Sequence, residues 1–193
     1  MKIFPRSLAV LIAATCLSAH AQQFTLGELE ENPGTFLQGL ASGWAVHELG
    51  HVIVARSMGY SVGHQGLSIT YGGKDMTAHD QERIASAGFQ AQWISSEVAF
   101  SSRKKNNSTF AAGFICAHLA ISAAYLTVLK NQKLSDSVGY ANATGLSTGQ
   151  IVWRAAIPAL LDGWRLFGND VPKWVPMLSV ATKAVGITAI WTY

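Results

Sequence analysis

Charged residues are scarce in this sequence. Asp, Glu, Lys and Arg make up 13% of the 193 residues, against about 25% in typical soluble domains. Hydrophobic residues account for 49%, and the mean hydropathy is +0.22. This balance favours a membrane location. The basic residues are scattered apart from Arg103-Lys104-Lys105, a cluster typical of a membrane flank and not of a nucleic-acid-binding surface.

Cysteine is almost absent as well. One of the two cysteines, Cys16, lies in an N-terminal segment that we expect to be removed, which leaves Cys116 alone in an apolar run. The mature chain therefore cannot form an intramolecular disulfide, and we expect Cys116 to be a small packing residue. The sequence also contains no repeat and no low-complexity tract.

The N-terminus has the features of a cleavable signal peptide. Lys2 and Arg6 precede a short apolar stretch, residues 8–19, and Ala19 and Ala21 are the small residues that signal peptidase requires. We predict a signal peptide over residues 1–21, an exported polar segment over 22–35 and a membrane-embedded domain over 36–193. The alternative is an uncleaved membrane anchor, for which the apolar stretch is short.

The sequence predicts a mainly α-helical membrane bundle of about four spans with a short β-hairpin after the first span. The predicted spans are 36–58, 109–129, 150–167 and 174–193. Residues 84–100 are ambiguous, since they carry Gln90, Gln92 and Glu97. We expect this segment to be re-entrant or interfacial, which would put the basic cluster on the opposite side of the membrane from residues 22–35.

Glycines and alternating side chains distinguish residues 60–77 from the apolar segments. Leu67, Ile69 and Tyr71 alternate with Ser68 and Thr70, and glycines bound the stretch. This pattern predicts a strand or hairpin. Beside a membrane helix, its edges must be covered by protein or water.

The first predicted span contains the sequence His47-Glu48-Leu49-Gly50-His51. On a helix, residues four apart lie on one face, at a separation that lets two imidazoles bind one zinc ion. Glu48 then projects beside the metal, where it can act as general base towards a zinc-activated water. The alternative is a structural hydrogen-bond network, but ionisable residues in a membrane span are costly and usually functional.

A zinc site of this kind needs a third protein ligand. We predict Asp162, which lies in an apolar run between Pro158 and Gly163. The alternative role for Asp162 is an i, i+3 ion pair with Arg165. Glu97 is the rival ligand, and His118 is a third, less favoured candidate.

These motifs carry a family resemblance. His47-Glu48-Leu49-Gly50-His51 followed by Leu161-Asp162-Gly163 resembles the site-2 protease family of intramembrane zinc metallopeptidases, in order over residues 36–168. The predicted hairpin looks like the membrane-associated hairpin of that family, and Ala87-Gly88 with Gln92 resembles a degraded form of its Ala-Gly-Pro-x-x-Asn motif. Phe89 stands in place of the motif's proline. No PDZ-like insert fits in this length.

The resemblance implies a fold, a metal and site roles. His47, His51 and Asp162 would bind Zn²⁺, and Glu48 would activate water. Arg154 stands near the position of an asparagine that the family associates with substrate handling, so we expect Gln92 and Arg154 to bind substrate. The hairpin residues Leu67, Ile69 and Tyr71 would bind an extended substrate segment by strand addition.

We therefore expect an intramembrane zinc metallopeptidase that cleaves membrane proteins or peptides within the lipid bilayer, in a bacterial inner membrane. Two alternatives remain open. One is a catalytically silent relative that binds metal or partners. The other is a membrane transport protein that uses His64, His79 and His118 with the two motif histidines as a relay.

Overall fold

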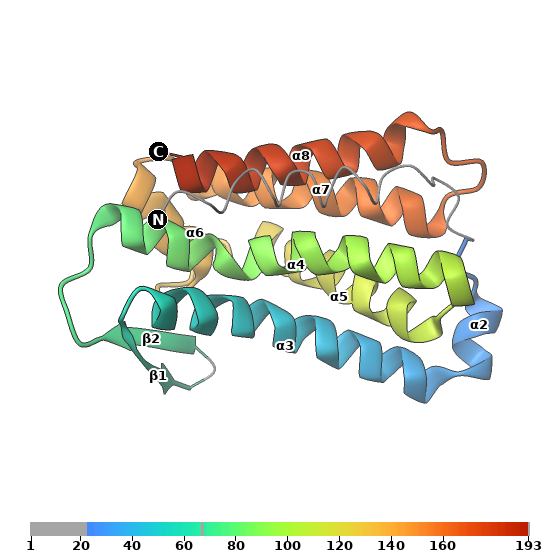
Figure 1. Cartoon of the computed structure of the whole chain (residues 1–193), viewed down its shortest axis with the longest axis horizontal. Helices are drawn as coiled ribbons and strands as arrows, with labels where there is room; N and C mark the ends of the chain where they lie inside the picture. Colours follow the sequence, from blue (N-terminus) through green and yellow to red (C-terminus); the bar gives the residue numbers. More distant parts are fainter. Residues whose placement is uncertain (1–22, 67, 193) are drawn as a thin grey trace.

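The computed structural model describes residues 23–66 and 68–192 and is mainly helical, with one two-stranded sheet (Figure 1). The predicted signal peptide, Leu67 and Tyr193 lie outside the described residues. The helices are α2 (Leu26–Glu31), α3 (Pro33–Ser57), α4 (Ala78–Asn106), α5 (Thr109–Leu126), α6 (Asp136–Thr144), α7 (Thr148–Phe167) and α8 (Trp174–Thr192). The strands are β1 (Ser61–Gln65) and β2 (Ser68–Gly72).

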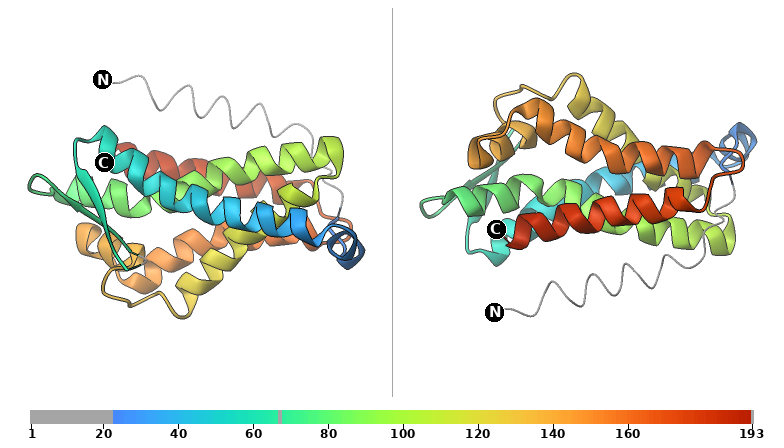
Figure 2. Two further views of the ribbon diagram at one scale, coloured as in Figure 1. Left: turned by 90° about the horizontal axis from the view of Figure 1, so that it is seen from below. Right: turned by 90° about the horizontal axis from the view of Figure 1, so that it is seen from above.

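Five of these helices, α3, α4, α5, α7 and α8, run along one axis as a bundle (Figures 1 and 2). The hairpin and α6 lie at one end of the bundle, and α2 lies at the other. Local sequence sets several helix starts, because the side chains of Thr77, Ser108 and Ser147 each accept a hydrogen bond from a first-turn backbone N–H. The predicted mainly helical fold is confirmed.

The predicted hairpin is also confirmed. β1 and β2 pair antiparallel, with Ser61 opposite Gly72 and Gln65 opposite Ser68. Gly66 follows β1 with a φ of 61°, in the left-handed region where glycine is favoured. The hairpin packs on the C-terminal end of α3 through Tyr60 and Val62, which belong to an apolar cluster with Ala55.

Small residues bring α3 and α5 into close contact. A Cβ atom added at Gly39 would lie 2.0 Å from the carbonyl oxygen of Phe110, and one added at Gly113 would lie 2.0 Å from that of Phe36. Only glycine permits this approach of the two backbones. Glycine near the start of the first predicted span therefore determines how closely α3 packs on α5.

The structure contradicts a re-entrant course for residues 84–100. These residues belong to α4, an uninterrupted helix of 29 residues that runs the length of the bundle. Arg103 at its end donates to both carboxylate oxygens of Glu28, each at 2.9 Å. The basic cluster and the polar N-terminal segment therefore lie at the same end of the molecule, and not on opposite sides of a membrane.

Two helices, α5 and α8, are long and apolar enough to cross a membrane by length and composition alone. They correspond to the predicted spans 109–129 and 174–193. The other two predicted spans form helices α3 and α7, but these do not share that property, because their sequences include ionisable side chains such as Glu48 and Asp162. The number of spans predicted from the sequence, four, is not confirmed.

Candidate metal centre

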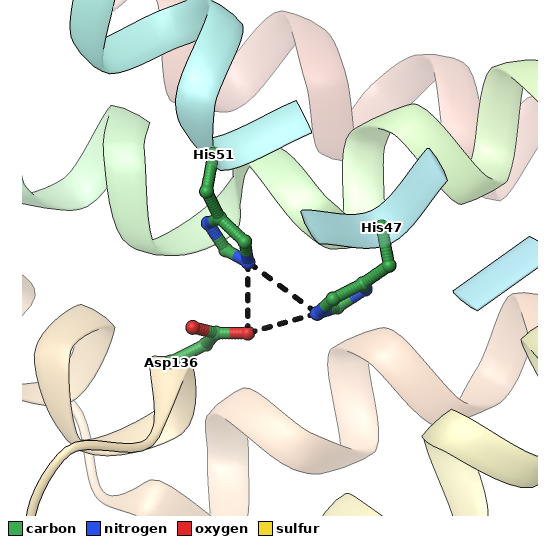
Figure 3. A group of neighbouring side chains, drawn as sticks. All are labelled: His47, His51 and Asp136. Atoms are coloured by element: carbon green, nitrogen blue, oxygen red, sulfur yellow. Dashed lines mark hydrogen bonds and ion pairs between the residues drawn. The ribbon is translucent and has the colours of Figure 1, made fainter. Parts of the chain in front are cut away.

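Three side chains meet near the hairpin end of the bundle (Figure 3). His47 and His51 project from α3, and Asp136 is the first residue of α6. The Nε2 atoms of the two histidines lie 3.4 Å apart, and Asp136 Oδ2 lies 3.0 Å from His47 Nε2 and 3.1 Å from His51 Nε2. Both imidazoles are buried. This group could hold a metal ion.

Hydrogen bonds at the far side of each ring fix which nitrogen faces the centre. His51 Nδ1 lies 2.7 Å from the carbonyl oxygen of Ile84, and His47 Nδ1 lies 3.2 Å from Gln92 Oε1. Both partners accept hydrogen bonds, so Nδ1 carries the proton in each ring. Nε2 of each ring therefore faces the other ring and the carboxylate, and it is the atom that would bind a metal once the imidazole is neutral.

Three acceptor atoms at such separations repel one another unless a cation or protons lie between them. Nitrogen and oxygen ligands held at about 2.0–2.1 Å by a tetrahedral zinc ion lie about 3.3 Å from each other. The observed separations, 3.0, 3.1 and 3.4 Å, are close to that value. Two imidazoles and one carboxylate are also a common ligand set for catalytic zinc. The residues present therefore fit a zinc ion.

Glycine is required where α4 passes the two rings. A Cβ atom added at Gly88 would lie 2.4 Å from His51 Nε2 and 2.6 Å from His47 Nε2. Likewise, a Cβ atom added at Gly50 on α3 would lie 2.5 Å from the carbonyl oxygen of Ala87. The two helices approach closely enough for α4 to hold both rings only because neither position has a side chain.

Aromatic side chains surround the third ligand and the first histidine. The Tyr125 hydroxyl donates to Asp136 Oδ2. The Phe89 ring meets the His47 ring edge to face, with centroids 5.3 Å apart. Burial alone would raise the pKa of Asp136, but the neighbouring imidazoles of His51 and His47 outweigh it and lower that pKa well below its ordinary value. This lowering depends on positive charge at the imidazoles, so without a metal Asp136 pairs with a protonated histidine, and a bound metal would displace that proton.

Two of the predicted catalytic and substrate-binding residues lie beside this centre. Glu48 is half-buried, and its carboxylate lies close enough to His47, His51 and Asp136 for their charges to act on it. Tyr71 on β2 is also near: burial, followed by the negative charges of Asp136 and Glu48, raises the pKa of its phenol. Ile69 lies on the same strand, and Leu67 lies outside the described residues.

The structure does not bring Asp162 to the histidines. Asp162 Oδ2 accepts from Lys183 Nζ at 2.6 Å and lies 3.2 Å from His118 Nδ1. Its Oδ1 accepts from Arg165 at 3.0 Å and from Ser179 at 2.6 Å. Both oxygens are thus occupied by protein donors, so the carboxylate that meets His47 and His51 is Asp136 and not the predicted Asp162. The i, i+3 ion pair with Arg165, which was the alternative for Asp162, is present.

The other candidate ligands also lie elsewhere. Glu97 accepts from Arg165 at 2.6 and 2.9 Å and from Lys183. His118 contacts Asp162, while His64 and His79 are exposed. Among the described residues, the metal-binding group contains no histidine besides His47 and His51.

Gln92 lies at the centre and Arg154 does not, and the role of both in substrate binding stays a prediction. Gln92 is buried and orients His47, so it supports a ligand. Arg154 is exposed on α7, at a cavity between α4, α7 and α8 that none of the three candidate ligands lines.

Sequence reasoning missed Asp136. It follows Ser135 at the start of a nine-residue helix, where an acidic residue is ordinary because it favours the helix N-terminus. Its one distinguishing property is long-range: it lies within hydrogen-bond distance of two histidines on α3. No pattern in the sequence predicts that contact.

No family model, no curated protein and no solved structure matches this chain. The functional assignment therefore depends on the residues and their geometry.

Proposed function

We propose that this protein is a zinc-dependent peptidase that cleaves membrane-associated proteins or peptides. One observation carries the proposal: the Nε2 atoms of His47 and His51 and the Asp136 carboxylate converge within metal-binding distance, with each Nδ1 tied to an acceptor. Glu48, next to the first ligand, supplies the general base that hydrolysis requires.

Each side chain of the centre has a separate role in hydrolysis. Zinc bound by His47, His51 and Asp136 would supply a Lewis acid that lowers the pKa of water to about 7. Glu48 accepts the proton of the attacking water and later gives it to the leaving amine. Tyr125, by donating to Asp136, holds the carboxylate in place.

The location in a membrane is part of the proposal. The apolar helices α5 and α8 support it, and so do the ionisable side chains buried between helices, which in membrane proteins face the bundle interior. We propose that α3, α4 and α7 lie in the bilayer with them, and that the chain is exported to a bacterial inner membrane through residues 1–21. A substrate would then be a membrane protein or peptide with a helix that unwinds locally.

The hairpin is the proposed substrate platform. It lies at the same end of the bundle as the ligands, and Tyr71 on β2 is electrostatically coupled to Glu48 and Asp136. An extended substrate segment pairing with β2 would therefore pass next to the general base. Replacing Ile69 with proline should slow cleavage and leave zinc binding intact. Unchanged cleavage would exclude this mode of binding.

A catalytically silent metal protein is the second candidate. It is favoured by one observation: Asp162 of the Leu161-Asp162-Gly163 motif is engaged by Lys183, Arg165, Ser179 and His118, so the ligand set differs from the one that the family resemblance implies. Such a protein would bind zinc but leave every peptide intact.

The deciding experiment measures zinc content and cleavage of fluorescein-labelled casein on monodisperse protein in detergent. We expect Asp136→Ala to lose zinc and Asp162→Asn to keep it, while Glu48→Gln keeps zinc and loses cleavage. Zinc retained in Asp136→Ala but lost from folded Asp162→Asn would contradict the site. A zinc-loaded wild-type protein without cleavage would support the silent alternative.

A further inference from the structure

A cavity of about 550 Å³ lies between α4, α7 and α8, apart from the metal centre. Its walls are largely apolar or small and include Phe89 and Trp93 of α4, Pro158 of α7 and Gly186 of α8. A Cβ atom added at Gly186 would lie 2.7 Å from the Trp93 ring, so Trp93 is packed directly against α8. This volume falls in the range of small-molecule sites.

The cavity opens on an apolar face of the bundle. Ile157 of α7 and Leu178 and Val185 of α8 line it, yet their side chains are 45%, 44% and 68% exposed. Exposed aliphatic side chains around an apolar cavity suit a hydrocarbon chain and not a water-soluble ligand.

Exposed tryptophans lie at both ends of α8. Trp174 and Trp191 are 51% and 41% exposed, and Trp174 packs edge to face on Trp164 of α7 with centroids 5.3 Å apart. The two α8 tryptophans are seventeen positions apart, which corresponds to about 25 Å at 1.5 Å per residue. Tryptophans at about this spacing are typical of the two interfaces of a bilayer, whose hydrocarbon core is about 30 Å thick.

A guanidinium lies at the mouth of the cavity. Arg154 is the one charged residue among those that line it, and it is exposed next to Trp153. A second guanidinium, that of Arg83, lies over the Trp191 ring, 5.1 Å from its centroid. Cations at the interface level of an apolar groove complement a lipid phosphate.

We propose that this cavity binds an acyl chain of an anionic phospholipid, with the lipid phosphate at Arg154. The proposal depends on the proposed membrane location and is independent of peptidase activity. A lipid in this cavity would contact the metal centre through Phe89, which lines the cavity. The Phe89 ring centroid lies 5.3 Å from that of His47 and 4.9 Å from that of Tyr125. The bound acyl chain supports the wall on which a zinc ligand packs.

Quenching of Trp93 by brominated lipid tests the proposal. The full chain is reconstituted in phosphatidylcholine vesicles that contain phosphatidylglycerol, with bromine on the acyl chains of one lipid or the other at equal mole fraction. The difference in quenching between wild type and Trp93→Phe gives the contribution of Trp93. We expect brominated phosphatidylglycerol to quench Trp93 with about fivefold preference, the factor that one interfacial cation supplies.

Two variants locate the lipid. Ala181→Phe fills the cavity and should remove most Trp93 quenching, whereas Ala123→Phe, on the exposed surface of α5 outside the cavity, should leave it unchanged. Arg154→Gln should abolish the preference for the anionic lipid. Equal quenching by both lipids, or quenching that survives Ala181→Phe, would overturn the proposal.

The same preparations are assayed for zinc and casein cleavage. Selective quenching without cleavage contradicts the peptidase and leaves the lipid site standing. Cleavage without selective quenching contradicts the lipid site and leaves the peptidase standing. A chain that does not enter the vesicles overturns the lipid site together with the membrane location.

Discussion

Two buried clusters of ionisable side chains lie in this bundle, and they differ in the balance between donors and acceptors. In the ionic cluster of Glu97, Asp162, Arg165 and Lys183, two carboxylates face two cations, and both oxygens of Asp162 accept hydrogen bonds. At the metal centre, two imidazole Nε2 atoms and one carboxylate face one another. Burial is common to both clusters, whereas lysine and arginine are present only in the ionic cluster, and the metal centre has titratable imidazoles in their place.

That difference explains why Asp162 is misleading in the sequence. A carboxylate in an apolar run does mark a special environment, and Asp162 is fully buried. The environment, however, is already neutralised by Lys183 and Arg165, so Asp162 has no need of a metal. A buried acid indicates a ligand only where the protein supplies no cation.

The strongest test of the comparison removes an acceptor from the metal centre. His51→Ala should abolish stoichiometric zinc binding, because two remaining ligands do not form a structural or catalytic site. Elemental analysis after dialysis against a weak chelator measures this. His79→Ala, at an exposed histidine, is the control and should keep full zinc. Equal zinc in both variants would contradict the centre.

Removing a cation from the ionic cluster should act on stability instead. Lys183→Met leaves Asp162 and Glu97 with one cation between them, and breaking such a buried pair costs about 3–5 kcal/mol. Thermal unfolding monitored by circular dichroism measures the loss. Lys173→Met, at an exposed lysine, should change little. Loss of zinc without loss of stability in Lys183→Met would contradict the separation of the two clusters, because it would show that the ionic cluster takes part in zinc binding.

A methyl group at Gly88 would crowd the two imidazoles and should therefore weaken the metal centre. We expect Gly88→Ala to lose zinc affinity and about 1–3 kcal/mol of stability through overpacking. Competition with a chromophoric chelator reports the affinity. Gly163→Ala is the matched helical control, because its new methyl would meet only Leu119 at 3.7 Å. Similar zinc affinity in both variants would count against the close approach of α4.

The smallest expected effect comes from the support of the third ligand. Tyr125→Phe removes the hydroxyl that donates to Asp136, and loss of such a partner typically lowers metal affinity about 10–100-fold. The same chelator competition measures it. Tyr60→Phe removes a hydroxyl that donates to Asp80, away from the centre, and should leave zinc affinity unchanged. An unaltered affinity in Tyr125→Phe would assign that hydroxyl to packing alone.

The sequence predicts those features that are local. The helix that carries His47 and His51 and the strand after Leu67 depend on neighbouring residues, and the structure contains both. The course of α4 could not be predicted, since its polar residues contact distant partners: Gln92 Oε1 contacts His47, and Glu97 contacts Arg165 and Lys183. Asp136 was missed for the same reason, because helix packing alone brings it to α3.

The hydrogen bonds to the two Nδ1 atoms have a consequence for motion. Gln92 and Ile84 both belong to α4, and α6, which carries Asp136, packs on α4 where Ala85 meets Tyr140 and Ala141. Contacts with α4 therefore position all three side chains of the centre, although α4 itself contributes none of them. The hairpin supplies neither of the hydrogen bonds that orient the two imidazoles, so a substrate strand added to it would leave those hydrogen bonds in place.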